Sequence, residues 1–103
     1  MANAVNHPHL RPKETKLLRH ALGLTGRSKV ADRFGAYATG PDIETWLHLV
    51  ELGLAVENEQ SRTPLSRYFF VTRAGFEAVK SGREKLNPDV ADRMDGLERG
   101  RAA

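Results

Sequence analysis

A chain of 103 residues, 40% of them hydrophobic, can bury the core of one small domain and is too short for two separate cores. The absence of cysteine excludes disulfides, thiolate-ligated zinc and a cysteine nucleophile, and favours a cytoplasmic setting. The first residues lack the apolar stretch of a signal sequence, and no apolar run approaches the roughly 18 residues of a membrane span, so we expect no membrane association. The chain divides into three expected parts: a flexible N-terminus (1–11), one domain (12–82) and a charged C-terminal extension (83–103).

The net charge of +3 is unevenly distributed along the chain. Residues 1–36 hold seven Lys or Arg against two carboxylates, and residues 60–86 hold six against two. Residues 41–59, by contrast, contain five carboxylates and no Lys or Arg. A surface that binds anions must therefore come from the first and third of these segments, unless both sets of charges are simply solvated.

A first helix is predicted to begin at Pro12, because the fixed φ of proline suits a first helical position, and to stop near Gly23. Leucines and an alanine share one face of this helix, which predicts that this face is buried. The opposite face is basic and carries Lys13, Lys16, Arg19 and His20. Such a stripe can contact phosphate groups, although the same charges also suit an ordinary solvated helix face.

The next segment, residues 23–40, contains four glycines and only one short helix-capable piece, SKVADRF at 28–34. We expect the second helix of a helix-turn-helix at this piece. The bases of the segment are Arg27, Lys29 and Arg33. Its glycines lack the spacing of a phosphate-binding loop, so we expect no bound nucleotide and no other cofactor.

Residues Pro41 to Leu52 have the clearest helical pattern of the chain. The apolar side chains recur at the i, i+3, i+4, i+7 spacing of one helix face, and Gly53 is placed to end the helix in a left-handed cap. Trp46 belongs to this apolar stripe, so we assign it to the core and not to base stacking. The other face is acidic and polar, with Asp42, Glu44, Thr45, His48 and Glu51. Because carboxylates repel phosphate, this helix is a poor candidate for the DNA major groove.

Two short runs rich in β-forming residues, which begin at Leu54 and Arg67, predict a β-hairpin joined by the turn EQSRTPLS. The turn also carries Arg62, and bases at the tip of a hairpin can contact phosphates or enter a minor groove. Thr72 is placed to cap a following helix, in which Gly75 would allow a close approach to the sheet.

The sequence LVELGLAVENEQ followed by YFFVTRAGFEAV resembles the wing region of winged-helix proteins, where an apolar helix ends in glycine and leucine before a hairpin that closes on a VTxxG-like segment. This resemblance covers about 40 residues and implies a small α+β winged-helix-like domain of helices and a two-stranded β-hairpin. Together with ALGL at 21–24 and the Arg33-Phe34 pair, the VTRAG segment is also similar to a group of small phage-encoded proteins. The second resemblance implies a phage or prophage origin and no particular activity.

The C-terminal extension is strongly charged, and a short helix is predicted there, with Asn87 as its cap and an end near Arg99. Its apolar stripe is narrow and consists of Val90, Met94 and Leu97. The helix either docks on the domain, forms a homodimer through residues 88–99, or frays, since isolated helices of this length are marginal.

The four histidines form no recognisable catalytic or metal-binding motif. His7 and His9 flank a proline near the N-terminus, an arrangement that does not build a closed metal site. No HExxH motif and no serine-nucleophile motif is present. We therefore expect no enzymatic activity and no bound metal.

Two hypotheses of function remain, from different classes. The first is nucleic-acid association, with double-stranded DNA as a possible partner, through backbone contacts of Lys13, Lys16, Arg19, Arg27, Lys29, Arg33, Arg62 and Arg67. It predicts steep salt dependence and little sequence preference. The second is a protein-interaction module, a phage factor that engages a host or phage protein through its acidic helix and hairpin, with contacts from Asp42, Glu44, Thr45, His48 and Glu51. The basic pI and the expected fold place the first hypothesis narrowly ahead.

Overall fold

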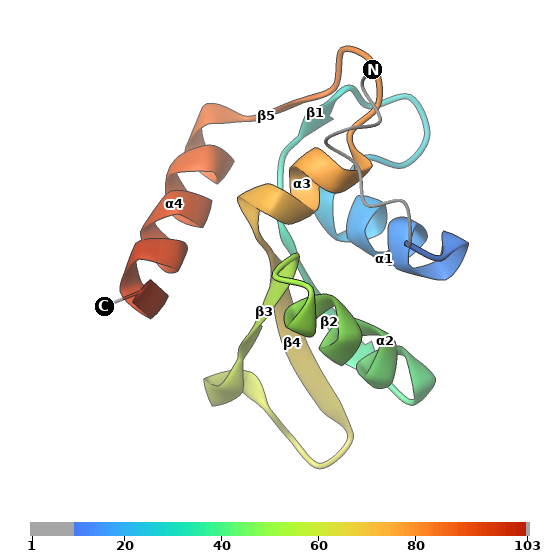
Figure 1. Ribbon diagram of the computed structural model, residues 1–103, viewed down its shortest axis with the longest axis vertical. Helices are drawn as coiled ribbons and strands as arrows, with labels where there is room; N and C mark the ends of the chain where they lie inside the picture. The colour runs from blue at the N-terminus through green and yellow to red at the C-terminus, as the bar shows by residue number, and fades with distance from the viewer. Residues whose placement is uncertain (1–9, 103) are drawn as a thin grey trace.

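The computed structural model describes residues 10–102, which form an α+β domain (Figure 1). Within these residues, four α-helices accompany a three-stranded antiparallel sheet and a separate parallel pair of short strands. The elements in chain order are α1 (Pro12–Leu22), β1 (Val30–Ala31), β2 (Gly35–Thr39), α2 (Pro41–Glu51), β3 (Ala55–Asn58), the 3-10 helix η2 (Glu59–Ser61), β4 (Ser66–Val71), α3 (Arg73–Val79), β5 (Lys85–Leu86) and α4 (Pro88–Ala102).

Helix α1 begins and ends where the sequence predicts. The N–H of Arg11, just before the helix, donates to the Glu14 carboxylate at 2.9 Å and closes the first turn. Gly23 has a left-handed φ of 77°, and the N–H of Leu24 returns to the carbonyl of Arg19 at 2.9 Å. Most of the expected flexible N-terminus, including His7 and His9, lies outside the described residues.

Helix α2 is also confirmed, and it places Trp46 in the core as expected. The Trp46 ring stacks on Phe69 of β4, with ring centroids 5.4 Å apart and an angle of 8° between the rings. At the end of the helix Gly53 has a φ of 78°, and the N–H of Leu54 bonds to the carbonyl of Leu49 at 3.0 Å. This cap turns the chain directly into β3.

The prediction of a helix at residues 28–34 is wrong. The chain there forms β1 and then leads into β2, which pairs antiparallel with β4 so that Gly35 lies opposite Phe70 and Thr39 opposite Ser66. Glycine and alanine are poor strand formers, so β2 is extended because β4 supplies its hydrogen-bond partners. The predicted two-stranded hairpin of β3 and β4 is consequently part of a three-stranded sheet in the order β2-β4-β3.

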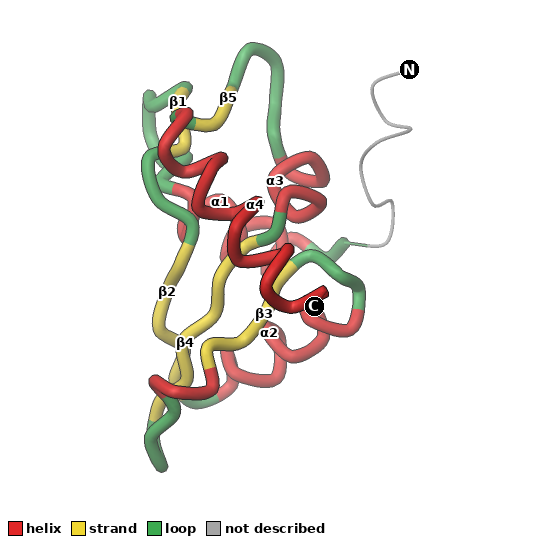
Figure 2. Tube along the Cα trace, turned by 90° about the vertical axis from the view of Figure 1, so that its left-hand side faces the viewer, coloured by secondary structure: helices red, strands yellow, loops and turns green. Residues whose placement is uncertain are grey.

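The two faces of the sheet have different neighbours. Helices α1 and α2 lie on one side of the sheet and α4 lies on the other, as both views show (Figures 1 and 2). On the first side Phe69 and Val71 are buried, in line with the alternation of β4, whereas Tyr68 and Phe70 face the other way and stay partly exposed.

Helix α3 packs closely on the sheet through the two residues singled out in the sequence. The Thr72 hydroxyl accepts from the N–H of Gly75 at 3.1 Å and donates to the carbonyl of Gly53 at 2.8 Å. A Cβ atom at Gly75 would collide with the backbone oxygen of Leu54. Both predictions, the cap and the close approach, are confirmed.

The C-terminal segment is joined to the domain by a parallel strand pair. β5 pairs with β1, with Val30 opposite Lys85, and α4 follows with the Asn87 side chain accepting from the N–H of Asp89 at 2.8 Å. Val90 and Met94 are buried in the common core, so α4 docks on its own domain. Homodimerisation through residues 88–99 stays a prediction and would use the side chains that this docking leaves exposed.

Among the described residues, no helix combines the length and the apolar character that a bilayer span requires.

Candidate nucleic-acid interface

The two hairpin arginines are bound to a carboxylate of the same hairpin. Glu57 on β3, whose side chain is 8% exposed, accepts two hydrogen bonds from Arg67 at 2.8 and 2.7 Å and two from Arg62 at 3.0 and 2.9 Å. The bonds from Arg67 lower the pKa of Glu57 to about 2 from its ordinary 4.5, against the effect of burial and with help from Arg62. The cluster therefore presents one net positive charge instead of two.

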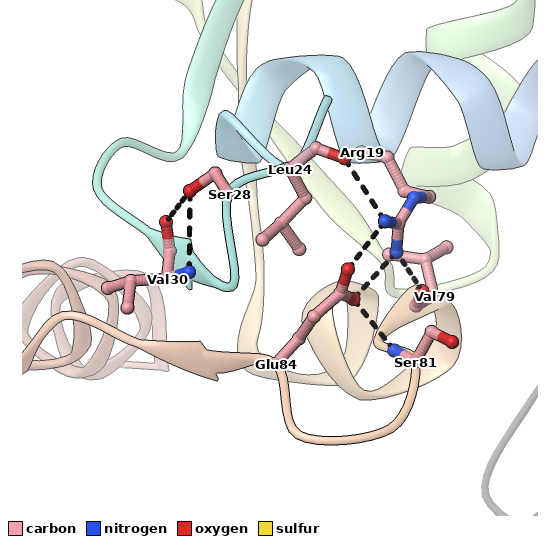
Figure 3. A network of polar contacts seen from close by, with 7 residues as sticks. All are labelled: Arg19, Leu24, Ser28, Val30, Val79, Ser81 and Glu84. Carbon is pink, nitrogen blue, oxygen red and sulfur yellow. Dashed lines mark hydrogen bonds and ion pairs between the residues drawn. The ribbon is translucent and has the colours of Figure 1, made fainter. Parts of the chain in front are cut away.

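Arg19 of α1 is likewise bound to other groups of the protein, and it lies partly buried at the centre of a polar network (Figure 3). Its guanidinium donates to both oxygens of Glu84 at 2.8 and 2.6 Å, and to the carbonyls of Val79 and Leu24 at 2.8 and 3.1 Å. The N–H of Ser81 adds a third bond to the Glu84 carboxylate at 2.7 Å. Arg19 thus joins α1 to the segment between α3 and β5, and its four terminal N–H donors are occupied.

Lys13 faces the acidic helix. Its ammonium group lies 3.1 Å from the carboxylate of Asp42, and both side chains are about half exposed, so solvent weakens the pair. Four of the eight predicted phosphate-binding bases are thus paired within the chain: Lys13, Arg19, Arg62 and Arg67. The other four have no carboxylate within ion-pair distance in the described part of the chain: Lys16, Arg27, Lys29 and Arg33.

The pairing of β1 with β5 creates a cluster of bases that the sequence did not reveal. Lys85 lies opposite Val30, and its N–H bonds to the carbonyl of Lys29 at 2.9 Å. We call Arg27, Lys29, Arg83 and Lys85 the basic end: all four are exposed, and they flank the two strands. The sequence alone places Arg83 and Lys85 in the C-terminal extension, and only the long-range strand pairing brings them beside Arg27 and Lys29.

The basic end and the acidic helix occupy opposite ends of the molecule. The loops around β1 and β5 lie at the top of Figure 1, whereas α2 and the hairpin lie at the bottom. Glu84, between two residues of the basic end, is buried and neutralised by Arg19, which holds its pKa below the ordinary value although burial acts in the opposite direction. Asp32 is therefore the one exposed carboxylate among residues 24–33 and 82–86.

A small cavity lies between the acidic helix α2 and the beginning of α1. Burial raises the pKa of Glu14 of α1, but hydrogen bonds from the Arg11 N–H and from His48 outweigh this effect and leave the pKa below its ordinary value. A cavity of about 170 Å³ lies here, lined by Arg11, Lys13, Glu14, Glu44, Thr45 and His48. Glu51 is exposed one turn further along α2. Of the five predicted protein contacts, three line this cavity: Glu44, Thr45 and His48.

A row of aromatic rings, which the sequence did not predict, crosses the sheet face opposite α1 and α2. Tyr37 of β2 meets Tyr68 of β4 edge to face with centroids 4.6 Å apart, and Phe70 follows at 5.1 Å from Tyr68. Phe34 completes the row, 5.1 Å from Phe70. The available signal was that Gly35 and Tyr37 are two residues apart and so share one face of a strand. This signal can be used only once residues 35–39 are known to be a strand.

Within the described residues, no group of three or more histidine or carboxylate side chains is arranged to hold a metal ion. The chain matches no protein-family model, and it has no significant match among curated proteins or solved structures.

Proposed function

We propose that this protein associates with nucleic acid through the sugar-phosphate backbone, and that the basic end is the contact. The observation that carries the proposal is the segregation of charge. Four exposed bases from two distant segments, Arg27, Lys29, Arg83 and Lys85, gather around β1 and β5 without an ion-pair partner in the described residues. A surface that concentrates positive charge favours a polyanion and releases its counterions on binding.

The proposal assigns different roles to the eight bases expected from the sequence. Arg27 and Lys29 contact phosphate directly, and Lys16 and Arg33 extend the positive surface along α1 and toward β2. Arg19, Arg62 and Arg67 hold the fold together through Glu84 and Glu57. Lys13 neutralises part of the acidic helix through Asp42.

A winged-helix-like arrangement is part of the proposal. It is supported by the succession of α2, β3 and β4 and by the strand β2, which precedes α2 and pairs with β4. In this arrangement α2 occupies the position of the helix before the wing. Because Glu44 and Glu51 are exposed on α2, we place α2 away from the nucleic acid. A phage origin and a cytoplasmic location remain predictions from the sequence.

The test is a fluorescence-anisotropy titration of a labelled mixed-sequence DNA duplex at several salt concentrations. Four phosphate contacts predict a slope of about −3 to −4 in a plot of log K against log salt concentration. The variant Arg27→Ala/Lys85→Ala should weaken binding and reduce the slope by about two. The matched control, Arg93→Ala/Arg99→Ala, removes the same charge from exposed positions of α4. Absence of binding at low salt, or equal weakening by both variants, would contradict the proposal.

The alternative, a protein-interaction module that uses the acidic helix, rests on a specific observation. Glu44 and Glu51 are exposed and have no ion-pair partner in the described chain, and the apolar side chain of Leu52 beside them is 37% exposed. An apolar side chain among carboxylates suits a basic partner surface. This candidate predicts that a protein captured by the wild type is lost with Glu44→Lys/Glu51→Lys and retained with Arg27→Ala/Lys85→Ala.

A further inference from the structure

The aromatic row is formed by Phe34, Tyr37, Tyr68 and Phe70, of which Phe34 packs against the main core and the other three do not belong to it. On the other side of the sheet, Trp46 and Phe69 already stack beneath α2. Tyr37, at one end of the row, is 68% exposed, although its ring touches Tyr68. Aromatic rings that keep contact with each other while one face stays open to solvent are suited to receive another planar ring.

The absence of a side chain at Gly35 of β2 leaves room for the ring of Tyr68 in the row. A Cβ atom added at Gly35 would collide with the Tyr68 hydroxyl and lie 2.8 Å from two carbons of its ring. Only glycine therefore lets this ring lie over β2, next to Tyr37. Gly35 thus makes room for the Tyr68 ring, which contacts Tyr37 and Phe70 before any ligand binds, and such preorganisation reduces the entropy lost on binding.

The sheet residues around the row add no charge that would repel an anionic ligand. By strand alternation, the side chains on this face of the sheet are all uncharged: Gly35, Tyr37, Thr39, Val56, Asn58, Ser66, Tyr68 and Phe70. Burial and then Tyr37 raise the pKa of Tyr68, and Arg33 lies near enough to offset a small part of this rise. Arg33 also continues the segment that carries Arg27 and Lys29, so the row adjoins the basic end.

We propose that the aromatic row binds the unpaired bases of a single-stranded nucleic acid, with Tyr37 and Tyr68 as the stacking residues and Arg33 and the basic end on the phosphates. This inference rests on the proposed association with nucleic acid and adds the strandedness of the ligand. Bases within a duplex are already stacked on each other, so only a single strand can offer them to the tyrosines. Helix α2, which carries the exposed Glu44 and Glu51, lies on the opposite side of the sheet (Figure 1).

The experiment compares labelled oligothymidylate and oligouridylate with a DNA duplex of equal length, at one salt concentration, by fluorescence anisotropy. Wild-type protein should bind at least one of the single strands more tightly than the duplex. Tyr37→Ala should weaken single-strand binding about tenfold, since one stacked base contributes roughly 1–3 kcal/mol. Tyr37→Phe keeps the ring and should retain the affinity, and neither variant should change duplex binding. Because Tyr37 is exposed, both variants should fold, which their melting curves verify.

The outcomes separate the two proposals. If the duplex binds through the basic end while Tyr37→Ala binds single strands as well as wild type does, the stacking inference is wrong and the proposed function stands. If neither duplex nor single strand binds at low salt, both are wrong. Loss of single-strand binding in Tyr37→Ala but not in Tyr37→Phe supports stacking, and comparison of the two oligonucleotides then shows whether the 2′-hydroxyl adds affinity.

Discussion

Arg19 and Glu84 are 65 residues apart in the sequence and form a partly buried, bidentate ion pair, with N–O distances of 2.8 and 2.6 Å. The Glu84 side chain is only 4% exposed. The pair fastens the segment that carries Arg83 and Lys85 to the end of α1. It therefore supports the position of the basic end as well as the stability of the fold.

Removal of one partner of this pair should be costly. Glu84→Gln is expected to lower the free energy of unfolding by about 3 kcal/mol, because the partly buried Arg19 guanidinium loses its counter-charge. Lys16→Ala, an exposed substitution on the same helix, should change it by less than about 0.5 kcal/mol. Urea denaturation at neutral pH measures both, and similar values for the two variants would show that the pair contributes little.

Glu57 predicts a specific dependence of stability on pH. Its pKa is about 2 in the folded protein against an ordinary 4.5, so the unfolded chain binds the proton more readily than the folded chain. The stability that Glu57 provides is complete above about pH 5 and is lost as the pH falls toward 2. The difference between the two pKa values corresponds to about 3 kcal/mol, an upper value because the Arg62 partner is 46% exposed.

The comparison that isolates this effect is between wild type and Glu57→Gln, since Glu14 and Glu84 also have lowered pKa values and titrate in both proteins. Glu57→Gln should be less stable by about 2–3 kcal/mol at pH 7, and the two stabilities should converge as the pH approaches 2. Denaturant unfolding at a series of pH values gives both curves. A constant difference between them would contradict the assignment.

Two glycines in helices should respond to alanine with opposite signs. At Gly75 a Cβ atom would collide with the backbone oxygen of Leu54 and lie 2.7 Å from a methyl carbon of Val71, so α3 must move away from the sheet. Gly75→Ala is expected to destabilise the protein by about 2 kcal/mol or more. At Gly96 the nearest atom is an Arg99 nitrogen at 3.8 Å, so Gly96→Ala should stabilise α4 by about 0.5–1 kcal/mol.

Thermal unfolding of the two glycine variants provides the measurement. The prediction fails if Gly75→Ala melts at or above the wild-type temperature, because the close approach of α3 to the sheet would then be absent in solution.

The docking of α4 can be tested at Met94, which is fully buried. Met94→Ala should cost about 2–5 kcal/mol through the lost contacts and the cavity left behind, whereas Arg93→Ala at the adjacent exposed position should be nearly neutral. Urea denaturation of both variants measures the difference, and near-neutral behaviour of Met94→Ala would show that α4 does not dock.

The predicted homodimer through residues 88–99 has a separate test. A melting temperature that rises with protein concentration would support it.

Several elements could be predicted because their determinants lie within a few residues of one another. The apolar spacing around Trp46 and the left-handed cap at Gly53 define α2 without reference to any other part of the chain. The same holds for the Thr72 cap, whose hydrogen-bond acceptor and donor are three residues apart. Local spacing fixes such features because the helix itself brings these residues together.

Strand β2 could not be predicted in this way. Its sequence, GAYAT, has weak strand propensity, and the preceding SKVADRF favours a helix when it is judged alone. Its partner strand β4 is separated from it along the chain by α2, β3 and the 3-10 helix η2. The aromatic row depends on the same pairing, so neither Tyr37 nor Gly35 was recognised as part of a surface.

The candidate site shows the same division between sequence and tertiary structure. By itself the sequence determined the helices α1, α2 and α3, the hairpin, the acidic face of α2 and the separation of charge into segments, because each depends on neighbours along the chain. Only the tertiary structure decided which bases are free, since Arg19, Arg62 and Arg67 meet carboxylates that local spacing does not place beside them, and only the parallel pairing of Val30 with Lys85 gathers the basic end. An ion pair or a strand pair depends on distance in space, and that distance is set by the packing of the whole domain.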